Sequence, residues 1–429
     1  MKQRIAALCL VVLVVSIGVG AEQWSGFRGP DARGQSAQAD VVTSWSETEN
    51  LVWKVPLPGP GSSSPIVWQD RVFVTCYSGY GLDKESPGDP NALKRHLVCV
   101  DASSGKVLWD RSVPAVLPEL PWRSRFQEHG YASQTPATDG ERVYVFFGKT
   151  GVLAFNMTGK QLWQQSVGTG SDTKKWGSAA SVTLTQDLVI VNAWDESKTL
   201  YALNKSDGQP KWQVDLSATD LSFATPILAT LEDGRQEIIM ALPLQIWGLD
   251  PQTGTKRWWI DTGIKGMVSC SPVVVNGIAY VHSGGQDGRS SLAVRCGGQG
   301  DVTETHILWS NTSDASSVTS PVHAAGHLYW VSSDGQTFCQ DANTGKLKYK
   351  DKLPVKNRFA VYASLVNIGD HLLAVTRHDG TFILAAQPEF VIEGNNKFNS
   401  DTSDFSGSPA VSGGHLFLRS FSHLYCLGK

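Results

Sequence analysis

The chain carries almost no excess charge of either sign, since 37 lysines and arginines face 40 aspartates and glutamates and the formal net charge is -3. No basic stripe stands out either, so the electrostatic footprint of a nucleic-acid-binding protein is missing and we expect no such partner. Motifs for metals and activated nucleophiles are equally scarce. The ten histidines form no His-Glu-x-x-His or His-x-His motif, and no serine stands in a Gly-x-Ser-x-Gly context. We therefore predict no catalytic residue and no metal site.

A long hydrophobic run is present only at the N-terminus. Lys2 and Arg4 precede the apolar run Ile5–Val19, and small residues follow it up to Ala21. These features predict a signal peptide over residues 1–21, cleaved near Ala21, and hence an exported protein of the periplasm or the extracellular space. The run is shorter than the about 20 residues that a helical membrane span needs, and no later stretch is apolar enough, so we expect no transmembrane span.

Cysteines are few, and six follow the predicted signal peptide. Three of them occupy one repeated position, namely Cys99, Cys339 and Cys426. Ala202 and Gly248 hold the same position in other repeats, so this position is expected to be a tightly packed, buried site for a small residue. Export permits disulfides, and two pairings stay open: Cys76 with Cys99, and Cys270 with Cys296.

Repetition is the most informative feature of the sequence. An Asp-x-x-Thr-Gly type of turn, followed by an aromatic residue, recurs at 99–109, 202–212, 248–258 and 339–349, with a version one residue shorter at 154–163. The acidic or amide side chain caps the turn, and glycine supplies a positive φ. The aromatic ring then buries apolar area against the neighbouring unit. This pattern predicts repeated β-hairpins that pack on one another.

Counting the opening strands gives eight units. Six begin next to a proline, at positions 65, 136, 226, 272, 321 and 409, and residues 179–182 and 364–365 fill the two gaps. The last unit lacks its outer strand, and Leu51–Val55 near the mature N-terminus supplies one. Pairing that strand with the last unit removes two exposed edges. We therefore predict an all-β fold: a lead-in segment over 22–50 and an eight-bladed β-propeller over 51–429, closed by the N-terminal strand.

These repeats resemble the PQQ-like (pyrroloquinoline quinone) propeller family, whose motif is Ala-x-Asp-x-x-Thr-Gly-x-x-x-Trp. The match covers residues 51–429, and residues 24–36 resemble the lead-in of secreted planctomycete-type members. BamB-like outer-membrane assembly propellers are more distantly similar, but they are usually lipoproteins, and this chain has no cysteine at the predicted cleavage point. The resemblance implies either a binding propeller or a dehydrogenase that uses PQQ and calcium.

Two long insertions, at 76–96 and 114–130, fall where loops of the first blade share one face of the ring. Their mixture of aromatic residues and arginines is typical of binding hot spots. The predicted binding face, with contributions from later loops, comprises Tyr77, Tyr80, Arg95, Trp122, Arg123, Arg125, Phe126, His129, Tyr131, Trp176, Lys265 and Arg358. The alternative is that Trp122 and Phe126 merely pin a long loop to the rim. Lys174, Lys175 and Lys356 stay open as contributors to an anion site at the mouth of the central channel.

The function predicted from these features is a non-enzymatic scaffold of the cell envelope that binds a protein or a glycan and needs no cofactor. Two adjacent pairs stay open as acid–base groups, namely Glu128 with His129 and His378 with Asp379. The alternative function is a quinoprotein dehydrogenase that oxidises alcohols or sugars with PQQ and Ca²⁺. Trp176 and Asp220 are the candidates for its stacking floor and its calcium site.

Overall fold

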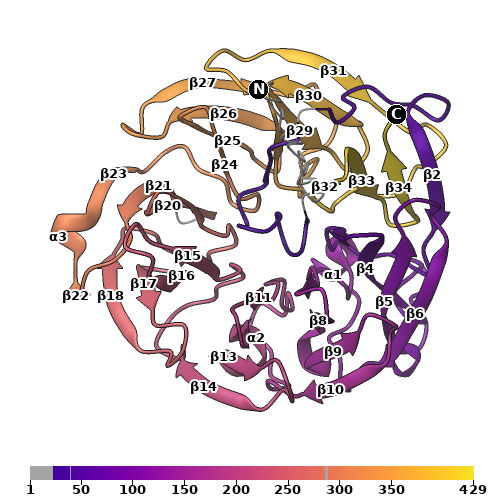
Figure 1. Ribbon diagram of the computed structural model, residues 1–429, viewed down its shortest axis with the longest axis horizontal. Coiled ribbons are helices and arrows are strands. Elements are labelled where there is room, and N and C mark those ends of the chain that lie inside the picture. Colours follow the sequence, from indigo (N-terminus) through magenta and orange to yellow (C-terminus); the bar gives the residue numbers. More distant parts are fainter. Residues whose placement is uncertain (1–22, 39, 286–287) are drawn as a thin grey trace, which may run out of the picture.

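The computed structural model describes residues 23–38, 40–285 and 288–429, so the predicted signal peptide lies outside the described residues. Eight sheets follow one another around a ring (Figure 1). Blade 1 contains β3 (Ile66–Trp68), β4 (Arg71–Ser78), β5 (Lys94–Asp101) and β6 (Val107–Pro114); blade 2 contains β7 (Ala137–Thr138), β8 (Arg142–Phe146), β9 (Val152–Asn156) and β10 (Gln161–Gln165). Blade 3 contains β11 (Thr183–Leu184), β12 (Leu188–Ala193), β13 (Thr199–Asn204) and β14 (Pro210–Asp215); blade 4 contains β15 (Ile227–Thr230), β16 (Gln236–Leu242), β17 (Gln245–Leu249) and β18 (Lys256–Asp261).

The second half of the ring repeats the same order of antiparallel strands. Blade 5 contains β19 (Val273–Val275), β20 (Ile278–Gly285), β21 (Gly288–Arg295) and β23 (Ile307–Asn311); blade 6 contains β24 (Val322–Ala324), β25 (His327–Val331), β26 (Gln336–Asp341) and β27 (Leu347–Lys352). Blade 7 contains β28 (Val366–Ile368), β29 (His371–Val375), β30 (Thr381–Ala385) and β31 (Ile392–Asn396); blade 8 contains β32 (Ala410–Ser412), β33 (His415–Arg419), β34 (His423–Leu427) and β2 (Leu51–Pro56). The prediction of an eight-bladed propeller is confirmed.

The N-terminal strand closes the ring, as the missing outer strand of the last unit predicted. β2 pairs antiparallel with β34, so that Trp53 lies opposite Cys426. From there the Trp53 indole reaches into blade 1 and donates a hydrogen bond to the Ala102 carbonyl at 2.8 Å. One short strand therefore joins the two ends of the chain and leaves no open edge between the last blade and the first.

A ring of hydroxyl groups links all eight blades around the central axis. In each blade, the backbone N–H of one residue donates to the hydroxyl of the equivalent residue in the next blade, at 2.9–3.1 Å. In ring order these residues are Ser64, Thr135, Ser181, Thr225, Ser271, Ser320, Ser364 and Ser408, and all are buried. Ser408 donates back to Ser64, so the circle is complete. Six of the eight immediately precede the prolines that marked the units in the sequence.

Tryptophans on the outer strands dock five of the eight blades onto the turn of the next. Each indole N–H donates to a backbone carbonyl at 2.8–3.1 Å; the pairs are Trp53 with Ala102, Trp109 with Met157, Trp163 with Lys205, Trp212 with Pro251 and Trp309 with Ala342. The turn glycine lies directly under the ring, because a Cβ at Gly105 would come within 2.8 Å of Trp53. Its φ of 72° also favours glycine. The predicted packing of rings on neighbouring hairpins is confirmed for Trp109, Trp163 and Trp212, and Trp53 and Trp309 dock in the same way.

Trp258 forms a different hydrogen bond from these five tryptophans. It donates to Glu237 of its own blade at 2.7 Å, because the neighbouring blade offers no turn of the same kind. There the short strand β22 (Gly300–Asp301) and the helix α3 (Thr303–His306) replace the turn, and β22 pairs in parallel with β18. Blade 4 is thereby extended by a fifth strand.

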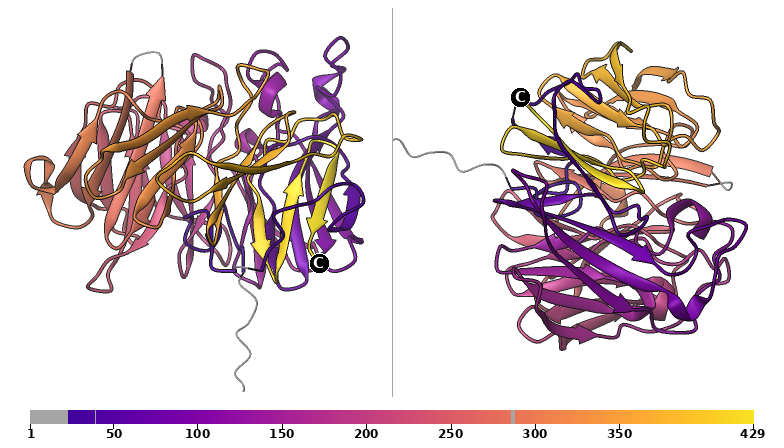
Figure 2. Two further views of the ribbon diagram at one scale, coloured as in Figure 1. Left: turned by 90° about the horizontal axis from the view of Figure 1, so that it is seen from above. Right: turned by 90° about the vertical axis from the view of Figure 1, so that its right-hand side faces the viewer.

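The lead-in segment crosses the opposite side of the ring from the long loops of the first blades (Figure 2). Its carbonyls accept hydrogen bonds from the inner strands of three blades: Trp24 from Val67, Ser25 from Thr138, and Gly34 from Asn367. Its short strand β1 (Gln35–Ser36) pairs in parallel with β28. Residues 24–36 of the lead-in therefore cover the ring end that the binding loops do not use.

None of the six cysteines in the described residues forms a disulfide, and all six are buried. Cys99 lies opposite Phe73 and Cys76 lies opposite His96, so these two cysteines occupy different rungs of the same ladder. The open pairing between them is therefore wrong, and so is the pairing of Cys270 with Cys296. Burial raises the pKa of the Cys270 thiol to about 12 and that of Cys76 to about 11, so both stay protonated.

The hydroxyl ring leads to a stability prediction. Replacing Ser364 with alanine removes the acceptor of the Ser320 N–H and leaves that buried group unpaired. We expect a loss of about 1–3 kcal/mol in the free energy of unfolding. Ser364→Thr keeps the hydroxyl, as Thr135 and Thr225 do elsewhere in the ring, and should cost much less. Urea unfolding of the two variants tests this, and equal losses would contradict the role of the hydroxyl.

Candidate functional site

The two insertions of blade 1 rise on the same side of the ring, which we call the linker face. This face consists of the loops that join strands two and three of each blade and the loops that link successive blades. β4 and β5 extend further than predicted, so the first insertion is a long hairpin whose loop covers 79–93 and includes the 3-10 helix η1 (Pro90–Ala92). The second insertion runs from the end of β6 and contains the helix α1 (Phe126–His129).

The insertions pack against each other through a small core of aromatic rings. Tyr77, Tyr80, Phe126 and Tyr131 are all buried there. The rings of Phe126 and Tyr131 lie 4.7 Å apart, and those of Tyr77 and Tyr131 lie 5.3 Å apart in an edge-to-face arrangement. The hydroxyls of Tyr77 and Tyr131 donate to backbone carbonyls within the same loops. These four predicted binding residues thus hold the loops in shape, and their rings face inward.

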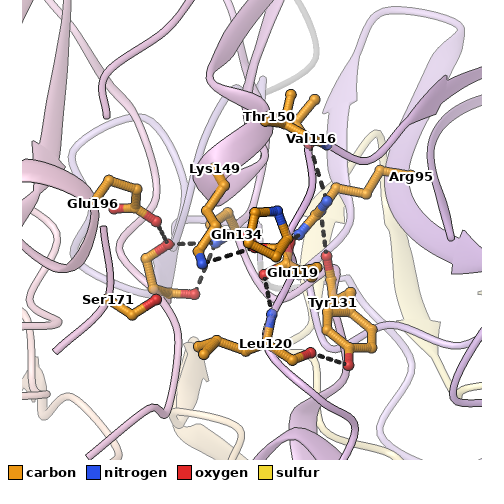
Figure 3. A network of polar contacts seen from close by, with 12 residues as sticks. Arg95, Val116, Glu119, Leu120, Tyr131, Gln134, Lys149, Thr150, Ser171 and Glu196 are labelled. Carbon is orange, nitrogen blue, oxygen red and sulfur yellow. Dashed lines mark hydrogen bonds and ion pairs between the residues drawn. The ribbon is translucent and has the colours of Figure 1, made fainter. Parts of the chain in front are cut away.

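A buried ion pair fastens the second insertion to blades 1 and 2 (Figure 3). Arg95 and Glu119 lie 2.5 Å apart, and each side chain is about 5% exposed or less. Arg95 also donates to the Tyr131 carbonyl at 3.1 Å and to the Thr150 hydroxyl at 3.0 Å. Breaking a buried pair by removing one partner costs several kcal/mol, because it leaves an uncompensated charge. Arg95 of the predicted binding face therefore acts as an anchor of the loop.

Next to this pair lies an acidic cluster that the sequence analysis missed. Asp195 and Glu196 belong to α2 (Trp194–Ser197), which joins strands two and three of blade 3. The Ser178 hydroxyl donates to Glu196 at 2.6 Å, and the Asp172 backbone N–H donates to Asp195 at 2.8 Å. Burial raises the pKa of Glu196 to about 8, and burial likewise raises the pKa of Asp195. A cavity of about 20 Å³, the size of one water molecule, lies between this cluster and the Arg95–Glu119 pair.

The helix α1 reaches across the ring to blade 7. Arg125 pairs with Glu128 at 2.7 Å, and Tyr362, from the loop before blade 7, donates its hydroxyl to the same Glu128 carboxylate. The Arg125 guanidinium lies 5.4 Å from the ring centre of Trp176 and 5.1 Å from that of Phe359. Loops of three separate linkers therefore meet around one arginine.

His129 joins α1 to the loop before blade 3. Its two ring nitrogens lie 2.8 Å from the Ser133 hydroxyl and 3.1 Å from the Trp176 carbonyl, and burial lowers its pKa. Glu128 is engaged by Arg125 and Tyr362, so the open acid–base pair of Glu128 with His129 is wrong. The pairing of His378 with Asp379 is also wrong, because His378 lies 2.7 Å from Asp404.

The remaining residues of the predicted face are accessible to solvent. Arg123, Lys265 and Arg358 are exposed, and Trp122, Arg125 and Trp176 are half-buried. Lys174, Lys175 and Lys356 are exposed on the same face. Large apolar side chains are exposed beside them, among them Leu82 at 54%, Leu117 at 43% and Leu244 at 50%. The accessible part of the linker face therefore combines cations with scattered apolar groups.

The described residues show no group of three or more histidine, cysteine, aspartate or glutamate side chains placed to hold a metal ion. Among those same residues, no helix has the length and the apolar character that crossing a membrane would require.

The closed ring of four-stranded sheets with docked tryptophans defines the chain as an eight-bladed β-propeller of the PQQ-like class. A family model described as outer membrane protein assembly factor BamB matches residues 93–351, more than half of the chain, and the protein belongs to this family. It is similar to BamB of Yersinia pestis, with 26% identity over 61% of this chain and 67% of that protein. BamB of Moranella endobia is also 26% identical, over 66% of this chain and 64% of its own length.

Two solved structures share the fold. BamB from Moraxella catarrhalis superposes with a TM-score of 0.61 and 15% identity, covering 88% of this chain and 99% of that one. The computationally designed protein Ika8 superposes with a TM-score of 0.59 and 10% identity, over 89% of this chain and 100% of the design. A tetrathionate hydrolase of Acidithiobacillus ferrooxidans is 23% identical over 57% of this chain and 50% of its own length.

The acidic cluster predicts a pH dependence of stability. The pKa of Glu196 is raised from 4.5 to about 8 in the folded protein. The folded state therefore holds the proton more tightly than the unfolded state, so this contribution is present below pH 4.5 and is lost as the pH rises through about 8. The thermal midpoint should fall over this window in the native protein and fall less in Glu196→Gln, which keeps an acceptor for Ser178. Parallel pH profiles for the two proteins would contradict this assignment.

Proposed function

We propose that this protein is a non-enzymatic scaffold of the cell envelope, which holds a protein partner against the linker face. Membership of the BamB family supports this function, because BamB relatives are outer membrane protein assembly factors. The observation that carries the proposal is the accessible part of the linker face, where exposed lysines and arginines surround a fixed cluster of aromatic rings. The envelope location agrees with the predicted signal peptide.

Pre-organisation of this face favours binding over a purely solvent-facing role. The aromatic core, the Arg95–Glu119 pair and the bridge from α1 to Tyr362 fix loops that would otherwise lose conformational entropy on binding. A rigid surface avoids this cost, which amounts to about 0.5–1.5 kcal/mol for each side chain that binding immobilises. The exposed cations, including Lys174, Lys265 and Arg358, attract a partner of negative potential and raise its association rate.

A protein partner is favoured over a glycan because the aromatic rings of this face are already covered or buried. Sugars stack on free ring faces, but Arg125 and Lys174 both lie over the ring of Trp176, at 5.4 and 5.2 Å. Phe126 and Tyr131 are buried in the insertion core. Cations held over aromatic rings beside exposed leucines are the surface chemistry of protein–protein hot spots.

The residues present do not fit the alternative, a dehydrogenase with PQQ and calcium at the mouth of the channel. Trp176, the candidate stacking floor, is covered by Arg125 and Lys174, and the hydrogen bond from Tyr362 to Glu128 joins the loops before blades 7 and 2. Asp220 is exposed and belongs to no cluster of potential metal ligands among the described residues. We derive no chemistry through this cofactor.

Photo-crosslinking in the envelope tests the proposed face. A benzoylphenylalanine placed at Arg123 or Arg358 should capture one partner, whereas the same group at Lys346, on the opposite face, should not. Both kinds of site are exposed, so the substitutions leave the core intact. Reversing the charge of Lys174, Lys175 and Arg358 together should lower capture at position 123 about tenfold.

Lys346→Glu, a single charge reversal on the opposite face, is the control and should leave capture unchanged. Deleting 114–130 is a poorer test, because it removes Glu119 and Phe126 from the buried network. Capture from position 346 alone, or no recurring partner from positions 123 and 358, would refute the proposed function.

A further inference from the structure

A larger cavity lies between blades 7 and 8. Its volume is about 240 Å³. The loop between β29 and β30 and the linker before β32 form its sides, and Trp45 of the lead-in segment closes one wall. The sequence pointed to His378 in this region only as one half of an acid–base pair, because the lining residues come from four separate segments of the chain.

Three aromatic side chains, Trp45, Phe398 and Phe405, form the apolar part of this cavity, and most of its other lining residues are polar. Trp45 and Phe398 are buried at 3% and 4% exposure, and Leu418 lies beside them. Phe398 is already stacked on Tyr425, with ring centres 4.2 Å apart, so its position is fixed. An apolar cavity of about 150 Å³ is large enough to bind benzene, so a cavity of this larger size has room for an indole or a phenol ring.

The rim of the cavity is cationic. Lys397 and His378 are exposed there, and Arg377 lies beside them. Both nearby carboxylates are already engaged: Asp404 contacts Arg377 and His378, and Asp401 accepts the hydroxyls of Ser420 and Tyr425. Among the described residues that line the cavity, Lys397 is therefore the cation without an ion pair, and it can meet an incoming negative group.

The cavity is connected to the proposed binding face. The Arg377 guanidinium lies 5.3 Å from the ring centre of Tyr362, which is the residue that donates to Glu128. The cavity therefore lies next to the loops that form the proposed binding face.

We propose that this cavity receives an aromatic side chain of the protein partner, tryptophan or tyrosine, that is followed by a carboxylate lying against Lys397. The proposal rests on the proposed function. It places the anchor of the interface in blades 7 and 8, whereas the exposed cations of the linker face attract the partner. Burying one such ring in a preformed pocket is the arrangement typical of a binding hot spot.

A small-molecule probe tests the cavity without knowledge of the partner. The full mature protein is titrated with 5-fluoro-N-acetyltryptophan, observed by ¹⁹F NMR, and with the corresponding amide, which lacks the carboxylate. We expect saturable binding of the acid that weakens about threefold for the amide and for Lys397→Glu. Thr402→Trp, which blocks the opening from an exposed lining position, should weaken binding at least about tenfold. Lys346→Glu is the control and should bind as the native protein does.

Absence of saturable binding, or binding that Thr402→Trp leaves unchanged, would overturn the proposal. The photo-crosslinking experiment repeated with Thr402→Trp separates the two proposals. Loss of partner capture in this variant supports the pocket as the anchor. Full capture in this variant, together with lower capture after the reversal of Lys174, Lys175 and Arg358, would refute the pocket as the anchor. The scaffold function would then still stand.

Discussion

The hydrogen-bonded circle of eight hydroxyls is the constraint on which the rest of the structure depends. Each blade contributes one backbone N–H and one hydroxyl, so every link needs a serine or a threonine at one fixed position. All eight positions, from Ser64 to Ser408, carry one of these two residues. A circle differs from a chain because no link is terminal. Opening any one of them exposes a buried donor and acceptor, and unpaired buried polar groups are costly. The pairing of β2 with β34 likewise closes the ring, at the outer edge of the last blade.

Because the ring is rigid, the insertions of one blade form a surface of fixed shape. The linkers leave each blade at a fixed angle, so two long loops in one blade must lie side by side. They fill the space between them with Tyr77, Phe126 and Tyr131 and tie themselves to blades 1 and 2 through Arg95. The reach of α1 across to Tyr362 depends on the same geometry, because blade 7 is held in place by the ring. The binding surface is therefore a consequence of closure.

Much of this architecture was predictable because it obeys local rules. Turn glycines with positive φ, such as Gly105, and the tryptophans that dock on them recur at fixed spacing, and the unpaired last hairpin identified β2 as its missing strand. The hydroxyl circle was not recognised, since small polar residues near the axis have an ordinary steric explanation. The burial of Trp258 against the next blade was predicted, but its hydrogen bond to Glu237 was not, because that partner depends on what replaces a turn in the next blade.

The candidate site was predictable only in its location. The insertions lie on one face as their connectivity required, but aromatic residues in a loop do not reveal whether their rings turn inward. Tyr77 and Phe126 turned inward, whereas Arg123 and Arg358 stayed exposed. Glu196 received no prediction, because its burial arises from contacts with segments distant in the sequence. Such long-range contacts carry no local signal.

Hydrogen exchange at the eight backbone amides of the circle tests the central claim most directly. If closure holds the molecule together, the amides of Ser64 through Ser408 should be among the slowest to exchange and should exchange at similar rates in every blade. The same rates should extend to blade 8, where two distant parts of the chain meet. Fast exchange at Ser408 and along β34, with slow exchange elsewhere, would show that the ring opens at its seam and would contradict the account.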